Sequence, residues 1–136
     1  MEFKYTYTRL NVANFEVCKA FYRDVLGLTV LFEDAMDEYV ELETGATKIS
    51  LINRDKVPEF VGRDELLSYS PDDASVVLTF VVPDVEAAVE YLTAKGVPMA
   101  NQPANFPDRG FVSVCFHDPD GNLIELEQMT DVVIGG

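Results

Sequence analysis

The sequence contains one histidine, two cysteines and few basic residues. His117 lies at the mouth of a predicted turn, where a solvated side chain is more common than a metal ligand or a base. Cys18 and Cys115 have neither CxxC spacing nor a nearby histidine, which argues against a metal site or a cysteine nucleophile. We therefore expect both thiols to be free and mostly buried.

Positive charge is also scarce. The chain has 10 lysines and arginines against 24 aspartates and glutamates, for a formal net charge of -14. This balance argues against binding to the phosphate backbone of nucleic acids and weakly favours a cationic ligand, although solubility alone also accounts for it.

Long hydrophobic runs are missing as well. No run approaches the roughly 20 apolar residues of a membrane-spanning helix, and Met1–Lys4 lacks the pattern of a signal peptide. We expect a cytoplasmic protein that binds neither membrane nor nucleic acid.

One pattern of secondary structure occurs twice along the chain. An alternating strand at 6–12 precedes a helix at 15–22 that Asn14 can cap, and a strand at 76–82 precedes a helix at 85–92 that Asp84 can cap. Each half then continues with three strand-like runs, at 28–33, 38–43 and 47–53 in the first half and at 97–101, 110–116 and 123–128 in the second. The sequence therefore predicts an α+β fold of two tandem βαβββ modules, 1–53 and 75–129.

A polar connector at 54–74, with one short helical turn at 64–67, joins the two predicted modules. A chain of 136 residues can bury one core, so we expect a single domain over 1–136. A four-stranded sheet covered by one helix leaves its other face and its edges exposed. We therefore expect the modules to pair into a cup-shaped, half-barrel sheet with the helices outside and a small-molecule site inside.

The second module ends in a predicted hairpin. In Asp118-Pro119-Asp120-Gly121-Asn122, proline fixes one φ, glycine accepts a positive φ, and the Asp and Asn side chains can bond nearby backbone. Alternation on the second arm separates Ile124 and Leu126 from Glu125, which is thereby held on a rigid strand.

Two motifs carry a resemblance to a known family. The run Phe21-Tyr22-Arg23-Asp24-Val25-Leu26-Gly27-Leu28 and the run from Asp118 to Leu126, set in paired modules, resemble the vicinal oxygen chelate superfamily. That superfamily includes glyoxalase I, extradiol dioxygenases, fosfomycin resistance enzymes and bleomycin resistance proteins. The resemblance covers nearly the whole chain and implies the cup-shaped fold, but it does not specify a reaction.

The resemblance also implies where a metal would lie. Metalloenzyme members hold a divalent ion through His, Gln or Glu side chains on four inner strands, and the corresponding positions here carry Tyr7, Ser50, Val77 and Glu125. Only Glu125 is a typical ligand, since valine has no lone pair and hydroxyls are weak donors at neutral pH. Catalytic metal sites usually take three protein ligands, so we predict no bound metal and no cofactor.

Strand alternation predicts which side chains line the cup. The inward positions, together with an aromatic residue that could stack on a planar ligand, form the predicted ligand-binding set: Tyr5, Tyr7, Arg9, Lys48, Ser50, Val77, Thr79, Phe111 and Glu125. Arg9 is predicted to be buried and would then need an acidic partner. The aromatic residues could equally belong to the core.

Glu125 has three interpretations. It could pair with Arg9 or Lys48 and hold the cup closed, it could contact a cationic or hydrogen-bond-donating group of a ligand, or it could act as a general base whose pKa is raised by burial.

We therefore predict a metal-free protein of the bleomycin resistance type that sequesters an organic small molecule, which the acidic composition favours as cationic. The alternative is a glyoxalase-like lyase or isomerase with Glu125 as the catalytic base or as the sole metal ligand. Exposed strand edges and the resemblance predict a homodimer.

Overall fold

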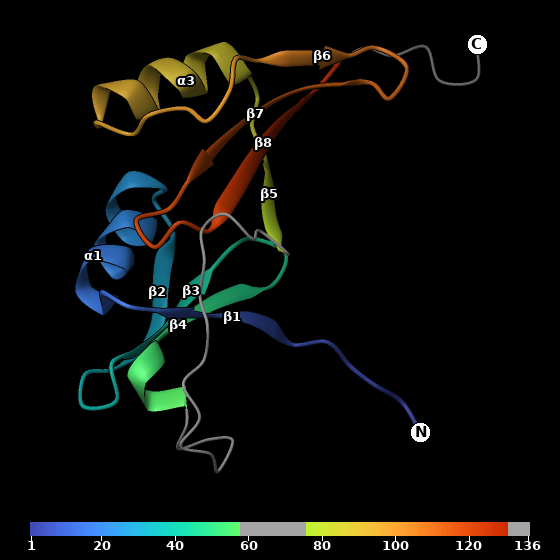
Figure 1. Cartoon of the computed structure of the whole chain (residues 1–136). Coiled ribbons are helices and arrows are strands. Elements are labelled where there is room, and N and C mark those ends of the chain that lie inside the picture. Colours follow the sequence, from blue (N-terminus) through green and yellow to red (C-terminus); the bar gives the residue numbers. More distant parts are fainter. Residues whose placement is uncertain (58–75, 131–136) are drawn as a thin grey trace. The chain divides into compact units, whose positions relative to one another are not determined.

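The computed structural model describes residues 1–57 and 76–130 (Figure 1). Most of the connector predicted at 54–74, including the helical turn at 64–67, lies outside these residues. The chain divides into two compact units, Met1–Ser68 and Tyr69–Gly136, which correspond to the two predicted modules. No helix in the described ranges is both long and apolar enough to cross a membrane.

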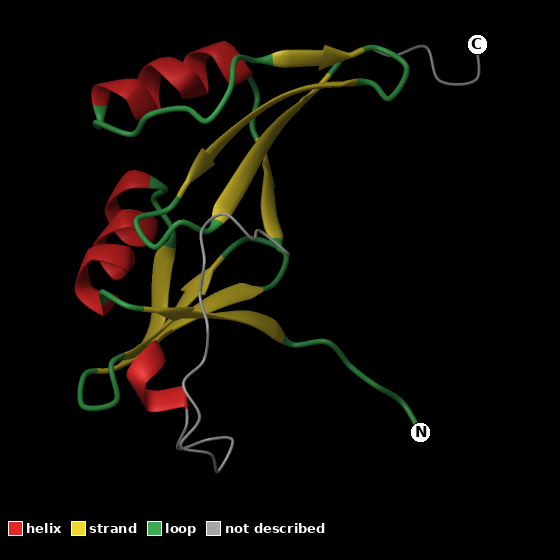
Figure 2. Ribbon diagram, in the orientation of Figure 1, coloured by secondary structure: helices red, strands yellow, loops and turns green. Residues whose placement is uncertain are grey.

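The first unit is a four-stranded sheet with a longer helical segment and a short 3-10 turn (Figure 2). The strand order is β1-β4-β3-β2, with β1 parallel to β4 and the other neighbours antiparallel. Its elements are β1 (Tyr7–Val12), α1 (Phe15–Ala20), the π-helical turn η1 (Phe21–Val25), β2 (Thr29–Asp34), β3 (Tyr39–Glu43), β4 (Lys48–Asn53) and the 3-10 turn η2 (Arg54–Lys56).

The second unit repeats this arrangement, in the order β5-β8-β7-β6. Again the first strand is parallel to the last one, and the remaining pairs are antiparallel. Its elements are β5 (Val77–Val81), α3 (Val85–Ala94), β6 (Ala104–Phe106), β7 (Phe111–His117) and β8 (Leu123–Met129). The predicted α+β fold of two βαβββ modules is confirmed.

Side-chain caps start both helices, as the sequence predicts. Asn14 Oδ1 accepts a hydrogen bond from the Val17 amide, and Asp84 Oδ1 accepts one from the Ala87 amide, both at 3.2 Å. Each bond satisfies one of the amides that the first turn of a helix leaves without a partner. The helical segment continues from α1 through η1 to Val25 and therefore ends before Gly27.

The strand predicted at 97–101 is wrong. Met99 makes only an isolated bridge with Phe116, and the strand of this part of the module is β6, further along the chain. Asn101 instead bonds the Cys115 amide through its side chain, at 2.8 Å. Pro98 and Pro103 lack the amide N–H that a ladder needs, so a regular strand cannot extend between them.

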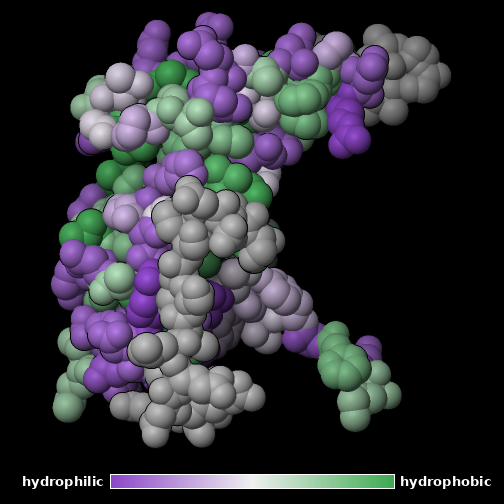
Figure 3. All heavy atoms as spheres, in the orientation of Figure 1, coloured by the Kyte–Doolittle hydropathy of each residue, from purple (hydrophilic) through white to green (hydrophobic). Residues whose placement is uncertain are grey.

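Alternation places one face of each sheet against its helix. In the first unit this core face carries fully buried residues of β1, β3 and β4, among them Val12, Val40, Leu42 and Leu51. An ion pair connects α1 to β2, because the Lys19 ammonium lies 2.6 Å from the Glu33 carboxylate. The same ammonium lies 3.1 Å from Glu16 on α1 itself. Hydrophilic residues cover much of the face shown in Figure 3, as the composition predicts.

The hairpin of the second unit is confirmed, and Asp118 holds it. The carboxylate accepts hydrogen bonds from the amides of Asp120 (2.9 Å) and Asn122 (2.8 Å) and from the Asn122 side chain (2.8 Å). Gly121 has a φ of 91°, as the turn requires. His117 and Leu123 are the last paired residues, so this turn sets the register that positions Glu125.

We expect Asp118→Ala to lower the free energy of unfolding by about 2–3 kcal/mol, because it leaves buried donors without an acceptor. Asp118→Asn keeps one acceptor oxygen and should lose less. Urea denaturation with an unchanged m-value measures the difference. The exposed Asp108→Ala, in another turn of the same unit, is the control and should stay within about 0.5 kcal/mol of the parent. Equal losses for the Ala and Asn variants would contradict this account of the turn.

Candidate functional site

The first sheet brings four of the predicted residues onto one face. Tyr7 and Arg9 of β1 are the register partners of Lys48 and Ser50 of β4. Side chains alternate along a strand, so these four project from the face opposite the core face, which we call the helix-free face. The first unit thus offers one polar surface built from two parallel strands.

Sequence analysis missed two residues of this face, Tyr39 and Glu41 of β3. The Tyr39 hydroxyl donates to Glu41 Oε2 at 2.5 Å, and Lys48 Nζ donates to Glu41 Oε1 at 2.9 Å. The Lys48 ammonium also lies 5.1 Å from the centroid of the Tyr7 ring, within the range of a cation–π contact. We call Tyr7, Tyr39, Glu41 and Lys48 the Glu41 cluster.

Contacts within the Glu41 cluster and burial shift the pKa values of two of its residues, Glu41 and Tyr39. The Lys48 hydrogen bond, followed by that of Tyr39, lowers the pKa of Glu41. Burial, followed by the hydrogen bond to Glu41, raises the pKa of Tyr39 well above its ordinary value. At neutral pH Glu41 is therefore a carboxylate and Tyr39 a protonated donor.

One hydroxyl beside the cluster is not satisfied. Ser50 is fully buried, and its Oγ makes no hydrogen bond of normal geometry among the described residues, although it lies near enough to Tyr39 to lower the pKa of that phenol. Asn11 Oδ1, one register row further, is also buried without a partner in the described part of the chain. The hydrogen-bonding capacity of this face is thus not exhausted internally.

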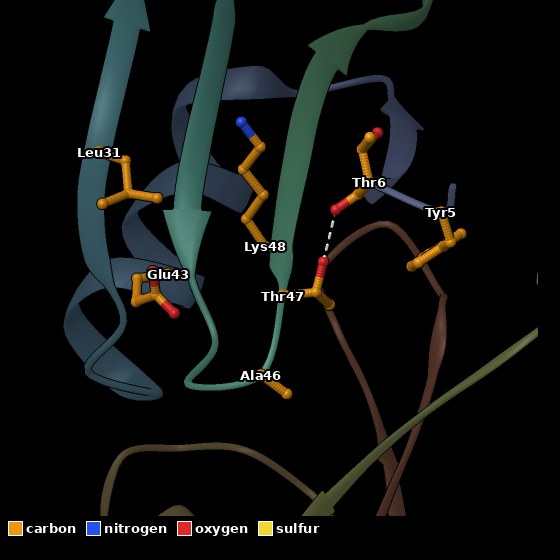
Figure 4. A pocket seen from close by; sticks show the side chains of 7 residues that line it. All are labelled: Tyr5, Thr6, Leu31, Glu43, Ala46, Thr47 and Lys48. Atoms are coloured by element: carbon orange, nitrogen blue, oxygen red, sulfur yellow. Dashed lines mark hydrogen bonds between the residues drawn. The ribbon is translucent and has the colours of Figure 1, made fainter. Parts of the chain in front are cut away.

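A shallow, open hollow of about 410 Å³ lies at the end of the same sheet (Figure 4). Thr47 beside it donates to the Thr6 carbonyl at 2.6 Å, which fixes the segment before β1 to the start of β4. The hollow is lined by Tyr5, Thr6, Leu31, Glu43, Ala46, Thr47 and Lys48. It therefore joins the predicted residues Tyr5 and Lys48 in one surface.

The predicted burial of Arg9 is wrong. The sequence predicts a buried guanidinium, but the side chain is exposed. The reason is that Arg9 lies on the helix-free face of β1, an edge strand whose one neighbour among the described strands is β4. Tyr5, which precedes β1, is 68% exposed.

In the second sheet Glu125 of β8 lies between Thr79 of β5 and Cys115 of β7. Burial raises the pKa of Glu125, and the neighbouring Glu127 carboxylate raises it further. The pKa of the Cys115 thiol is also raised, by burial and then by the charge of Glu125. Cys115 is therefore a neutral thiol and a poor nucleophile. Both cysteines are free, as predicted, and Cys18 is buried while Cys115 is half-buried.

By alternation, the remaining predicted residues lie on the same face of the second sheet as Glu125, which we also call its helix-free face. Thr79 is exposed, and Val77 is 44% exposed opposite Leu123. Phe111 stacks on Phe106, with ring centroids 5.0 Å apart and an interplanar angle of 30°. The second unit thus combines apolar surface with two carboxylates.

The donor set at the implied metal positions does not fit a divalent ion. Tyr7 and Ser50 lie on the first sheet, and Tyr7 already contacts an ammonium group. On the second sheet Val77 has no lone pair, which leaves Glu125 as the one strong donor of the four. Across the described residues no group of three or more His, Cys, Asp or Glu side chains could hold a metal ion.

Comparisons with known proteins agree with this fold. A family model described as "Glyoxalase/Bleomycin resistance protein/Dioxygenase superfamily" matches residues 4–126. The uncharacterized protein YraH of Bacillus subtilis (strain 168) is 34% identical over 121 residues, which cover 89% of this chain and 94% of YraH.

Two solved structures have the same fold. A glyoxalase/bleomycin resistance protein/dioxygenase from Nocardioides has a TM-score of 0.78 at 22% identity, covering 100% of this chain and 87% of its own. A lactoylglutathione lyase from Agrobacterium tumefaciens has a TM-score of 0.71 at 21% identity and covers 92% of each chain. At these identities the likeness shows the fold alone.

Removal of the Glu41 charge should reveal the pH dependence of the cluster. We expect Glu41→Gln to lower the free energy of unfolding by about 1 kcal/mol at pH 7, allowing for the partial exposure of the pair. The folded-state pKa of Glu41 is depressed, so the stabilisation is present above the unfolded-state value of about 4.3 and is lost as the pH falls through the folded-state value.

Urea denaturation at pH 7 and at about pH 3 measures this difference, which should shrink at the acidic pH. The control is Glu43→Gln on the same strand, whose side chain is exposed. A Glu41→Gln deficit that is independent of pH would rule out an electrostatic origin.

Proposed function

Since the chain belongs to the glyoxalase/bleomycin resistance protein/dioxygenase superfamily, we propose that it binds a small organic molecule without a metal ion and without transforming it. The observation that carries this proposal is the replacement of the metal donors. The four implied positions hold Tyr7, Ser50, Val77 and Glu125, and the first two adjoin an internal ion pair, Lys48–Glu41. The Lys48 ammonium places positive charge beside Tyr7, one of these four positions, and so disfavours a divalent cation there.

The composition of the two helix-free faces supports an organic ligand. They present aromatic, aliphatic and charged groups side by side, and a hollow of about 410 Å³ has the size of many small-molecule sites. In the second sheet the strands β5 to β8 contain two glutamates on this face and no lysine or arginine. Glu125 and Glu127 therefore favour a cationic or hydrogen-bond-donating group of the ligand.

The proposal predicts ligand binding that does not depend on metal. A thermal-shift screen of cationic glycopeptide and polycyclic compounds should find a ligand that stabilises the folded chain, by about 2.7 kcal/mol at a concentration of 100 Kd. EDTA should leave that shift unchanged, and elemental analysis of the purified protein should find no stoichiometric transition metal.

Glu125→Gln should weaken the binding of a cationic hit about tenfold, whereas Glu86→Gln, exposed on α3 of the same unit, is the matched control. A stoichiometric metal that EDTA removes together with ligand binding would overturn the metal-independent reading.

The alternative is a glyoxalase-like lyase or isomerase with Glu125 as base or metal ligand. Its support is the raised pKa of Glu125, which makes the carboxylate a stronger base. Turnover of the methylglyoxal–glutathione adduct that Glu125→Gln abolishes, with a rate that falls as the pH drops through the raised pKa, would establish this alternative. No turnover above that of the Glu125→Gln variant would exclude it for this substrate.

We also propose that the two modules form one domain and that the protein is a homodimer. The edge strands β1 and β2 of the first sheet and β5 and β6 of the second support this assembly, because unpaired edges favour closure by a partner. Light scattering should give twice the chain mass of 15.2 kDa, and a mass of one chain at low concentration would contradict the dimer.

A further inference from the structure

The hollow of the first unit has apolar walls and two charged groups. Leu31 and Tyr5 are 51% and 68% exposed, so both offer apolar surface to an occupant. Leu31 lies at a register shift in the β2–β3 pairing, between Val30 and Phe32, and such bulges redirect side chains. Figure 4 shows Leu31, Glu43 and Lys48 on three neighbouring strands around this space.

The charged groups are a donor and an acceptor on adjacent strands. Lys48 and Glu43 are direct register partners of β4 and β3. Lys48 uses one N–H for Glu41, and its side chain is 33% exposed, so further N–H donors can reach an occupant. Glu43 is exposed, and its Oε1 accepts from the Gly45 amide at 2.8 Å, which leaves Oε2 as an acceptor.

The opposite charges cancel within the hollow. A bound anion would be attracted by Lys48 and repelled by Glu43, and a bound cation would meet the reverse. The next register row likewise contains one positive and one negative side chain, Arg9 and Glu41, so the formal charges of the two rows sum to zero. An uncharged group that both donates and accepts hydrogen bonds can bond to both the Lys48 ammonium and the Glu43 carboxylate without net repulsion from either charge.

We propose that the hollow binds an uncharged amide group joined to an apolar ring or chain. The amide oxygen accepts from the Lys48 ammonium, the amide N–H donates to the Glu43 carboxylate, and the apolar part covers Leu31 and Tyr5. Two residues along β4 from Lys48, the buried Ser50 hydroxyl lies near Tyr39 but makes no hydrogen bond of normal geometry among the described residues, so it retains hydrogen-bonding capacity next to the hollow. This inference rests on the proposed binding function and names the chemistry of one ligand group.

Three probes of similar size, which share a benzene ring and differ in charge, test the inference: benzamide, benzoate and benzylammonium. Titration calorimetry or ligand-observed NMR with the full chain at pH 7 measures their affinities. We expect benzamide to bind about fivefold or more tightly than either charged probe.

Two variants should shift the preference in opposite directions. Glu43→Gln removes the negative charge, so benzoate should gain about five- to tenfold relative to benzylammonium. Lys48→Met removes the positive charge and should reverse this ratio. The exposed Glu90→Gln and Lys95→Met, both in the second unit, are matched controls that should leave the order unchanged.

Glu43 is exposed, so its variant tests the inference even where Lys48→Met fails to fold. Tighter binding of benzoate than of benzamide to the parent chain, or an unchanged ratio of benzoate to benzylammonium affinity in Glu43→Gln, would overturn the inference. Absence of benzamide binding at millimolar concentration would also overturn it. A failure of these probes leaves the proposed binding function intact if the metal-independent screen finds a ligand, so the two failures are distinguishable.

Discussion

The ion pair between Lys48 and Glu41 determines the chemistry of the first helix-free face. Glu41 receives hydrogen bonds from Lys48 and Tyr39, at 2.9 and 2.5 Å, so its charge is matched within the sheet. A partly buried carboxylate without such partners would cost free energy, and so would the ammonium alone. Burial, followed by the hydrogen bond to Glu41, raises the pKa of Tyr39 and keeps it protonated, and the pair places positive charge beside Tyr7. A divalent cation beside Tyr7 would be repelled by the Lys48 ammonium, which is a permanent part of this face.

The two sheets use one backbone plan for different chemistry. The central register row of the first sheet is Arg9–Ser50–Glu41, and that of the second is Thr79–Glu125–Cys115. The acid stands on β3 in one module and on β8, the counterpart of β4, in the other. A lysine one register row away neutralises Glu41, whereas the strands around Glu125 contain no lysine or arginine. The duplicated fold therefore supplies one neutralised and one uncompensated carboxylate.

Short-range signals predicted most of the skeleton. The caps Asn14 and Asp84 and the turn at Asp118 depend on neighbouring residues, so the sequence alone was enough to place them. The position of β6 depends instead on which segment pairs with β7, and the prolines at 98 and 103 moved that pairing along the chain. Glu41 was missed because its partner Lys48 comes from another strand. Extending the inward parity of β4 across the β3–β4 hairpin would have identified it, because directly paired residues share a face.

The surroundings of Glu125 favour binding over catalysis. A base that removes a proton beside a carbonyl needs an electrophile that stabilises the resulting oxyanion, through a metal ion, a cation or several aligned donors. Within its own sheet Glu125 is flanked by the Thr79 hydroxyl and the Cys115 thiol, and the nearest charge is the like charge of Glu127. Thr79 is a single neutral donor, the thiol is a weak one, and the second carboxylate repels an oxyanion. The same features would attract the positive charge or N–H donors of the proposed ligand, so within this sheet they support the binding proposal over the lyase or isomerase alternative.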